Sequence, residues 1–193
     1  MKKIAFIILF FVTTLVFSQS EQLAQNYYDK GEFEKALISY QELLKNQPLN
    51  SNYFNKYVEC LQQTKQLDVA ENKILEHIDK YKLGTLFIEL GYNYKLKKDD
   101  SKAKKYFDLA IEKVKKNPNE VFGIANLFEK KIMIDYALQA YQMARLVEPR
   151  MNFNYQIALL HGQKGETDLM IETFLSESYT NPMMLLSIQN QLS

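Results

Sequence analysis

The chain has 193 residues, of which 47% are hydrophobic and 24% charged, and its formal charge at pH 7 is +1. A charge so close to zero gives no reason to expect nucleic acid or an anionic membrane as a partner. The single cysteine, Cys60, excludes an internal disulfide, so stability has to come from packing. The small number of glycines and prolines, six and four, favours helix almost throughout.

Residues 1–18 have the parts of a secretory signal peptide. Lys2 and Lys3 make a basic start, residues 4–16 are apolar except for two threonines, and residues 16–18 suit a signal peptidase. This run is shorter than the roughly 20 residues that span a bilayer, although an uncleaved anchor is the alternative. We therefore expect an exported bacterial protein of the periplasm, envelope or exterior. Its mature form would have 175 residues, a formal charge of −1 and no membrane span.

After the signal, pairs of mostly apolar residues four positions apart recur every 33 or 34 residues. The pairs are Ala36/Tyr40, Ala70/Ile74, Ala103/Phe107, Ala137/Tyr141 and Met170/Phe174. A period of this length is typical of stacked helix hairpins. In the first unit, Gly31 suits the turn between two amphipathic segments and Pro48 ends the second. The pattern predicts a solenoid over residues 19–182, with repeats at about 19–50, 51–83, 84–117, 118–150 and 151–182.

These units resemble the tetratricopeptide repeat, whose pattern is an aromatic residue, Leu-Gly and Tyr, followed by Ala, a second aromatic residue and Pro. The third repeat matches most fully, with Phe87, Leu90, Gly91, Tyr94, Ala103, Phe107 and Ala110. The second repeat has His77 where a small residue is usual, and the fifth repeat has Met170 in place of Ala. The resemblance implies an all-α, right-handed superhelical solenoid of antiparallel helix hairpins. About five repeats and a partial sixth are expected, with small residues where the helices of a hairpin cross.

No catalytic or metal-binding set of residues is recognisable. His77, His161 and Cys60 fall at helix-packing positions, whereas zinc needs three or four ligands at regular spacing. Cys60 is expected to be a buried, inert thiol. Phosphate-binding and hydrolase motifs are absent from the sequence. We expect no enzyme activity, no cofactor and no metal.

Residues 95–116 hold nine lysines against four acidic residues. One interpretation is a docking patch for an anionic glycan, a lipid headgroup or an acidic partner. The other is the solvated outer face of a helix. Aromatic side chains that would stack on nucleic-acid bases are not expected on this face.

By the resemblance, the first helix of each hairpin lines a concave groove that often holds extended peptides or partner helices. The candidate partner-binding residues are Ile88, Tyr92, Lys95, Phe122, Asn126, Glu129, Lys130, Tyr155, Leu159 and Gln163. Aromatic anchors beside polar groups are common in binding hot spots. The alternative is that several of them pack against a neighbouring helix. The equivalent positions of the first two repeats are polar and acidic, and they are Glu21, Gln25, Tyr28, Asn55, Glu59 and Gln62.

The sequence therefore favours an exported, non-catalytic scaffold or adaptor that binds a protein or peptide partner. One alternative is the extracytoplasmic sensor or adaptor part of a longer envelope signalling protein. Another is an envelope glycan-binding protein, which the lack of tryptophan weakens and the thirteen tyrosines leave open. Residues 183–193 predict a terminal or truncated helix. Its apolar residues suit burial, self-association or partner docking.

Overall fold

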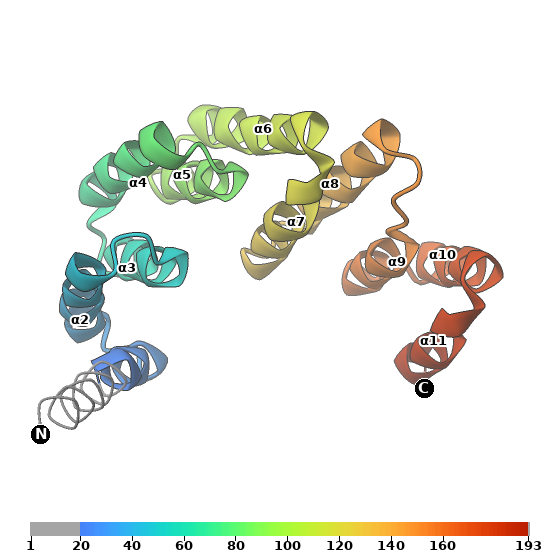
Figure 1. Cartoon of the computed structure of the whole chain (residues 1–193), viewed down its shortest axis with the longest axis horizontal. Coiled ribbons are helices and arrows are strands. Elements are labelled where there is room, and N and C mark those ends of the chain that lie inside the picture. The colour runs from blue at the N-terminus through green and yellow to red at the C-terminus, as the bar shows by residue number, and fades with distance from the viewer. Residues whose placement is uncertain (1–19, 193) are drawn as a thin grey trace, which may run out of the picture. The chain divides into compact units, whose positions relative to one another are not determined.

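The computed structural model describes residues 20–192, and the regular elements in that part are all helices (Figure 1). The predicted signal peptide lies outside the described residues. The chain divides into two compact units, one ending at Glu76 and the other beginning at His77. Among the helices of residues 20–192, none has both the length and the apolar character of a membrane span.

The first unit contains a helical segment at residues 20–29, then α2 (Phe33–Asn46), α3 (Ser51–Gln63) and the start of α4 (Leu67–Tyr81). The Asn50 side chain caps α3, because its oxygen accepts hydrogen bonds from the backbone N–H groups of Asn52 and Tyr53 at 3.1 and 3.2 Å. Pro48 lies in the loop that separates α2 from α3.

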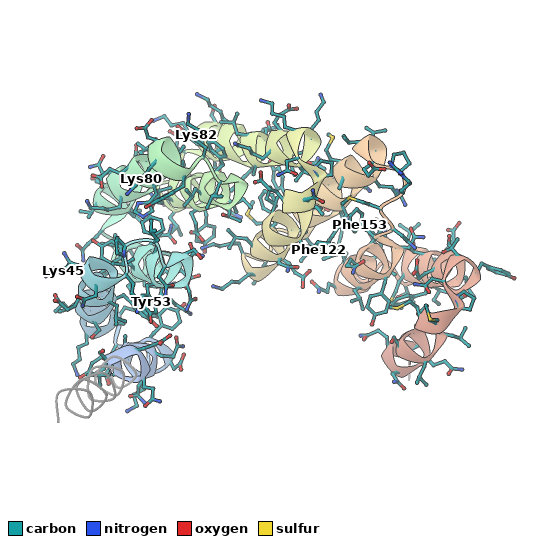
Figure 2. All side chains as sticks on the ribbon, viewed as in Figure 1. Lys45, Tyr53, Lys80, Lys82, Phe122 and Phe153 are labelled. Atoms are coloured by element: carbon teal, nitrogen blue, oxygen red, sulfur yellow. The ribbon has the colours of Figure 1, made fainter. Side chains whose placement is uncertain are left out.

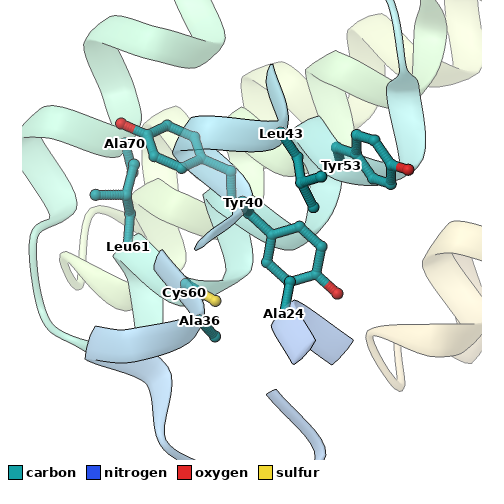
Figure 3. Close-up of a cluster of buried hydrophobic side chains, with 9 residues drawn as sticks. Ala24, Ala36, Tyr40, Leu43, Tyr53, Cys60, Leu61 and Ala70 are labelled. Atoms are coloured by element: carbon teal, nitrogen blue, oxygen red, sulfur yellow. The ribbon is translucent and has the colours of Figure 1, made fainter. Parts of the chain in front are cut away.

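Small side chains and tyrosines form the core of the first unit (Figure 3). Its buried members are Ala24, Ala36, Tyr40, Leu43, Tyr53, Tyr57, Cys60, Leu61 and Ala70. The Tyr40 hydroxyl donates a hydrogen bond to Gln25 Oε1 at 2.9 Å, which satisfies its polar end. Burial raises the pKa of the Cys60 thiol to about 12, so the predicted buried thiol is confirmed and carries little thiolate at neutral pH.

The second unit continues the alternation of paired helices. The elements are α5 (Gly84–Leu96), α6 (Asp100–Lys116), η1 (Pro118–Glu120), α7 (Val121–Lys130), α8 (Ile134–Val147), α9 (Asn154–Gln163), α10 (Thr167–Thr180), η2 (Pro182–Met184) and α11 (Leu185–Leu192). Phe107 of α6 packs against Phe128 and Tyr136, with ring centroids 5.7 and 5.1 Å away. These contacts join the hairpin of α5 and α6 to that of α7 and α8.

Small residues stand where the helices of a hairpin approach most closely. A Cβ atom on Gly91 would lie 2.5 Å from a ring carbon of Phe107 and 3.0 Å from the carbonyl oxygen of Ala103. Ala125 and Ala137 are fully buried. In the fifth hairpin, the larger Met170 replaces the usual alanine, and a glycine lies opposite it. A Cβ atom on Gly162 would lie 2.7 Å from the sulfur of Met170. The small residue expected at the crossing of the third hairpin, Gly91, is confirmed.

The five hairpins within residues 20–192 all have the same turn. One residue of each turn has a left-handed backbone, with φ between 58° and 77°, and these residues are Gly31, Lys65, Lys98, Ile132 and Gly165. The next residue donates its N–H to the carbonyl five positions earlier, at 2.8–2.9 Å. This is the Schellman arrangement that ends helices. Its spacing of 34, 33, 34 and 33 residues repeats the period of the sequence.

Replacing Ile132 with glycine is expected to raise the free energy of unfolding by about 1 kcal/mol. Ile132 has a φ of 58°, where a branched side chain is strained, and it is 85% exposed, so little packing is lost. Ile132→Ala keeps a Cβ atom in the left-handed region and is expected to gain less. Urea denaturation measures both variants. Equal gains would show that loss of the exposed side chain, and not backbone strain, controls the effect.

Candidate partner-binding surface

One face of α7 points to solvent and carries three of the predicted partner-binding residues. Phe122, Asn126 and Glu129 follow one another at i, i+4 and i+7, so they share a face. Lys130 is exposed at its edge. The opposite face is fully buried and consists of Val121, Ile124, Ala125 and Phe128. α7 therefore presents a ring, an amide, a carboxylate and an ammonium group on its open side.

Phe122 remains 48% exposed although two other rings hold it in place. Its ring meets Tyr141 and Phe153 edge to face, with centroids 6.1 and 5.5 Å away. Figure 2 shows Phe122 on α7 close to Phe153, which precedes α9. Burial raises the pKa of Tyr141 to about 12, so its hydroxyl stays neutral. A ring that is fixed on one side and open on the other needs little ordering to bind a partner.

α9 continues this surface. Tyr155 packs on Phe174 of α10 with ring centroids 5.6 Å apart, and Tyr155 and Leu159 are each half-buried. Gln163 is exposed, and its Nε2 donates a long hydrogen bond of 3.4 Å to Glu129 Oε1 of α7. We call the following residues the α7–α9 surface: Phe122, Asn126, Glu129, Lys130, Tyr155, Leu159 and Gln163.

The predicted residues of α5 behave differently. Ile88 is completely buried, so its assignment as a partner contact is wrong. The ring of Tyr92 is half-buried and lies 4.4 Å from Lys131 Nζ. Lys131 in turn forms a 2.9 Å ion pair with Glu89, and both charged side chains are nearly inaccessible. Lys95 alone among the three predicted α5 residues is exposed. α5 is apolar on several sides, so its repeat phase does not reveal which side is covered.

The shared turn and the small residues at the hairpin crossings identify the fold. The chain has the tetratricopeptide-repeat fold. The predicted all-α hairpin architecture is thereby confirmed. No protein-family model matches the chain, and no curated protein matches it in sequence.

Several solved structures are similar to the chain. MamA is 16% identical, with 88% of this chain and 93% of that chain covered and a TM-score of 0.44. YrrB, a TPR protein with an unusual peptide-binding site, is 16% identical over 89% and 90% of the two chains, with a TM-score of 0.41. TTC0263, a TPR protein of Thermus thermophilus, is 15% identical over 91% and 96%, with a TM-score of 0.46. At these scores, the fold assignment rests on the repeats of the chain itself.

A hollow of about 470 Å³ adjoins the last hairpin and enlarges the predicted site. It is lined by Leu159, Gly162, Gln163, Met170 and Gln191. The repeat pattern predicts only Leu159 and Gln163 for this place. Met170 stands out in the sequence as a departure from the usual alanine. The repeat pattern does not mark Gln191, because α11 is too short for its residues to be assigned repeat positions.

The predicted groove residues of the first unit are engaged within that unit. The Tyr28 hydroxyl donates a 2.6 Å hydrogen bond to Glu59, and Lys56 Nζ lies 3.6 Å from the same carboxylate. Burial, followed by this hydrogen bond, raises the pKa of Tyr28. Glu59 and Gln62 are buried, at 7% and 4% exposure. The expectation that these two residues line an open groove is wrong.

Three lysines of the lysine-rich segment lie beside aromatic rings. The distances from the lysine Nζ atom to the ring centroid are 4.9 Å for Lys102 and Tyr94, 5.7 Å for Lys105 and Tyr106, and 5.9 Å for Lys113 and Phe87. Rings therefore lie beside these lysines, but Tyr94 is buried, and Tyr106 and Phe87 are half-buried. Lys104–Asp108 and Lys115–Glu112 are exposed ion pairs of α6. Lysine stems that cover ring edges are usual on a solvated amphipathic helix.

The histidines take part in local contacts. His161 Nδ1 lies 2.6 Å from Glu166 Oε2, and Lys164 Nζ lies 2.7 Å from the other oxygen of that carboxylate. Hydrogen bonds from Lys164 and then His161 lower the pKa of Glu166. The His77 ring packs on Tyr81 with centroids 5.3 Å apart. Over residues 20–192, no three His, Cys, Asp or Glu side chains are grouped to hold a metal ion.

Proposed function

We propose that the chain is a non-catalytic protein-interaction scaffold that holds a protein or peptide segment on the α7–α9 surface. The observation that carries this proposal is the half-exposed Phe122 ring, fixed by Tyr141 and Phe153. An aromatic side chain that is rigid and accessible is a frequent anchor of protein interfaces. Its position on the solvent-facing side of a first helix agrees with the way in which repeat arrays offer binding surfaces.

The surroundings of Phe122 suit the backbone of an extended segment. The side-chain amides of Asn126 and Gln163 each donate and accept hydrogen bonds, as peptide groups require. Glu129 and Lys130 add one charge of each sign. The hollow beside Leu159 and Met170 has apolar walls that would take an apolar side chain of the partner.

We also propose that the protein is exported and acts in the bacterial envelope or beyond. This proposal is supported by the basic start and apolar run of residues 1–18, which lie outside the described residues. A partner would then be an envelope or extracellular protein. Mass spectrometry of the protein recovered from cells, in the experiment below, tests whether residues 1–18 are cleaved, as export through a signal peptide requires. A mass that retains residues 1–18 would contradict cleavage.

Site-specific photo-crosslinking in the source cells tests the binding surface. A photoreactive phenylalanine analogue replaces Asn126, which is exposed on the open face of α7. The matched control carries it at Gln139, exposed on α8 on the side away from the buried Ala137 and Tyr141. We expect a discrete crosslinked protein from position 126 and none from position 139. The same adduct from both positions, or from Gln139 alone, would place binding elsewhere.

A further inference from the structure

The last helices of the second unit carry an exposed apolar surface. On α10, Ile171, Leu175 and Tyr179 follow one another at intervals of four residues, and on α11 Leu185 and Leu192 lie on the side of Ile188. Each of these five side chains, which we call the α10–α11 face, is at least 41% exposed. Ile188 and Phe174 belong to one buried cluster between the two helices, at the C-terminal end of Figure 1. Clusters of exposed apolar side chains on neighbouring helices are a common mark of interaction sites.

Comparison with α7 shows what normally covers such a surface. Both α7 and α11 follow a short helix that begins with proline, so Val121, Ile124 and Phe128 correspond to Leu185, Ile188 and Leu192. The three α7 residues are fully buried, and Phe128 stacks on Tyr136 of its partner helix α8 at 5.1 Å. On α11 only Ile188 is buried, whereas Leu185 and Leu192 are each half-exposed. The α11 part of the α10–α11 face thus has the pattern that a paired helix covers in the fourth hairpin.

The charges beside this face favour one kind of occupant. Residues 165–192 contain four acidic residues and no lysine or arginine. Asp168 and Glu172 are exposed on α10 next to Ile171 and Leu175 in the helical spacing, and neither makes an ion pair within the described residues. If two copies met through this face, the carboxylates of one would approach those of the other. Like charges at an interface are unfavourable, so a basic partner fits better than a second copy.

We propose that the α10–α11 face binds an amphipathic helix of a partner protein that carries lysine or arginine beside its apolar stripe. The apolar residues of this helix pack on Leu185 and Leu192, in the way that α8 packs on α7. Its basic residues pair with Asp168 and Glu172. This face shares no residue with the α7–α9 surface, so the chain would have two docking sites, which adjoin at the hollow beside Gln191 of α11.

A peptide with the sequence of α6 is a suitable probe. Residues 100–116 form a second helix of a hairpin, contain six lysines and three acidic residues, and bury Ala103, Phe107 and Ala110 against their own repeat. The Lys104–Asp108 ion pair of 2.6 Å shows where a lactam would hold the free peptide helical. Fluorescence anisotropy of the labelled lactam peptide, titrated with the mature chain, measures binding.

We expect saturable binding that weakens at least about tenfold in the variant Leu185→Asp/Leu192→Asp. The variant Asp168→Lys/Glu172→Lys is expected to weaken peptide binding as well. Added salt is expected to weaken peptide binding to the natural chain but not to this charge variant. The matched control is Leu146→Asp, a leucine of α8 that is 76% exposed and lies outside the face. This control is expected to bind the peptide as the natural chain does.

Three results would overturn the proposal. The first is no binding of the lactam peptide to the natural chain, and the second is equal binding by Leu185→Asp/Leu192→Asp. The third is concentration-dependent dimer formation in sedimentation that the same variant abolishes, since this would make a second copy the occupant. A control peptide with glutamate in place of its free lysines separates charge from apolar contact, and it is expected not to bind.

Discussion

Gly91→Ala is expected to lower the free energy of unfolding by about 1–3 kcal/mol, although alanine is the better helix former. The new Cβ atom would lie 2.5 and 2.6 Å from two ring carbons of Phe107 and 3.0 Å from the Ala103 carbonyl oxygen. Phe107 cannot move aside easily, because its ring is held against Phe128 and Tyr136. The crossing of α5 and α6 would have to open, and the third hairpin would lose packing. Urea denaturation of the mature chain measures the change.

Gly123→Ala is the matched control for this prediction. Gly123 is also inside a helix, but a Cβ atom there would meet nothing closer than Thr85 Cγ2 at 3.7 Å, an ordinary contact. Alanine is expected to stabilise that position by up to about 1 kcal/mol. The variant Phe107→Leu tests the cause further, because a smaller side chain at 107 should reduce the cost of Gly91→Ala. If both glycines respond to alanine in the same direction and to the same extent, the close crossing is not real.

Lys131→Ala is expected to cost about 3 kcal/mol, the largest effect of any single charge removal in the second unit. Lys131 Nζ lies 2.9 Å from Glu89 Oε2, and the two side chains are only 7% and 1% exposed. The ammonium group also lies 4.4 Å from the centroid of the Tyr92 ring. Its removal takes a close cation from a buried carboxylate, which water cannot easily replace.

The surface pair Lys104–Asp108 provides the control. It has a shorter distance of 2.6 Å, but its side chains are 69% and 50% exposed, so Lys104→Ala is expected to leave the free energy of unfolding almost unchanged. The double variant Glu89→Leu/Lys131→Met is expected to recover much of the loss, because it removes both charges together. Equal effects of Lys131→Ala and Lys104→Ala in chemical denaturation would contradict the buried pair.

The sequence predicted the hairpins because their signals are local. Small and aromatic residues such as Gly91, Ala103 and Phe107 recur at fixed positions of the repeat. These three residues lie against one another in the structure. The left-handed turn residues were only partly predictable. Glycine at position 31 predicts a left-handed turn residue. Lys65 and Ile132 do not predict one by their residue type, and they have the left-handed backbone because they stand at the same position of the repeat.

The exposure of the candidate partner-binding residues was predictable only where no other part of the chain covers them. Phe122 and Asn126 are accessible as expected, since the rest of α7 supplies its buried side. Ile88 and Glu59 occupy related positions but are buried, because burial depends on side chains distant in sequence. The pairing of Glu89 with Lys131 spans 42 residues and leaves no trace in local periodicity.

The affinity of the crosslinked partner for two charge-bearing variants measures the role of the α7–α9 surface most directly. Asn126→Arg places a bulky cation on the open face of α7, and Gln139→Arg places the same group on the exposed side of α8. Neither position is buried, so thermal stability should be unchanged in both. Isothermal titration calorimetry with the purified partner is expected to show at least about tenfold weaker binding for Asn126→Arg alone. If Asn126→Arg binds the partner with the affinity of the natural chain, whatever the affinity of Gln139→Arg, this result would contradict binding at the α7–α9 surface.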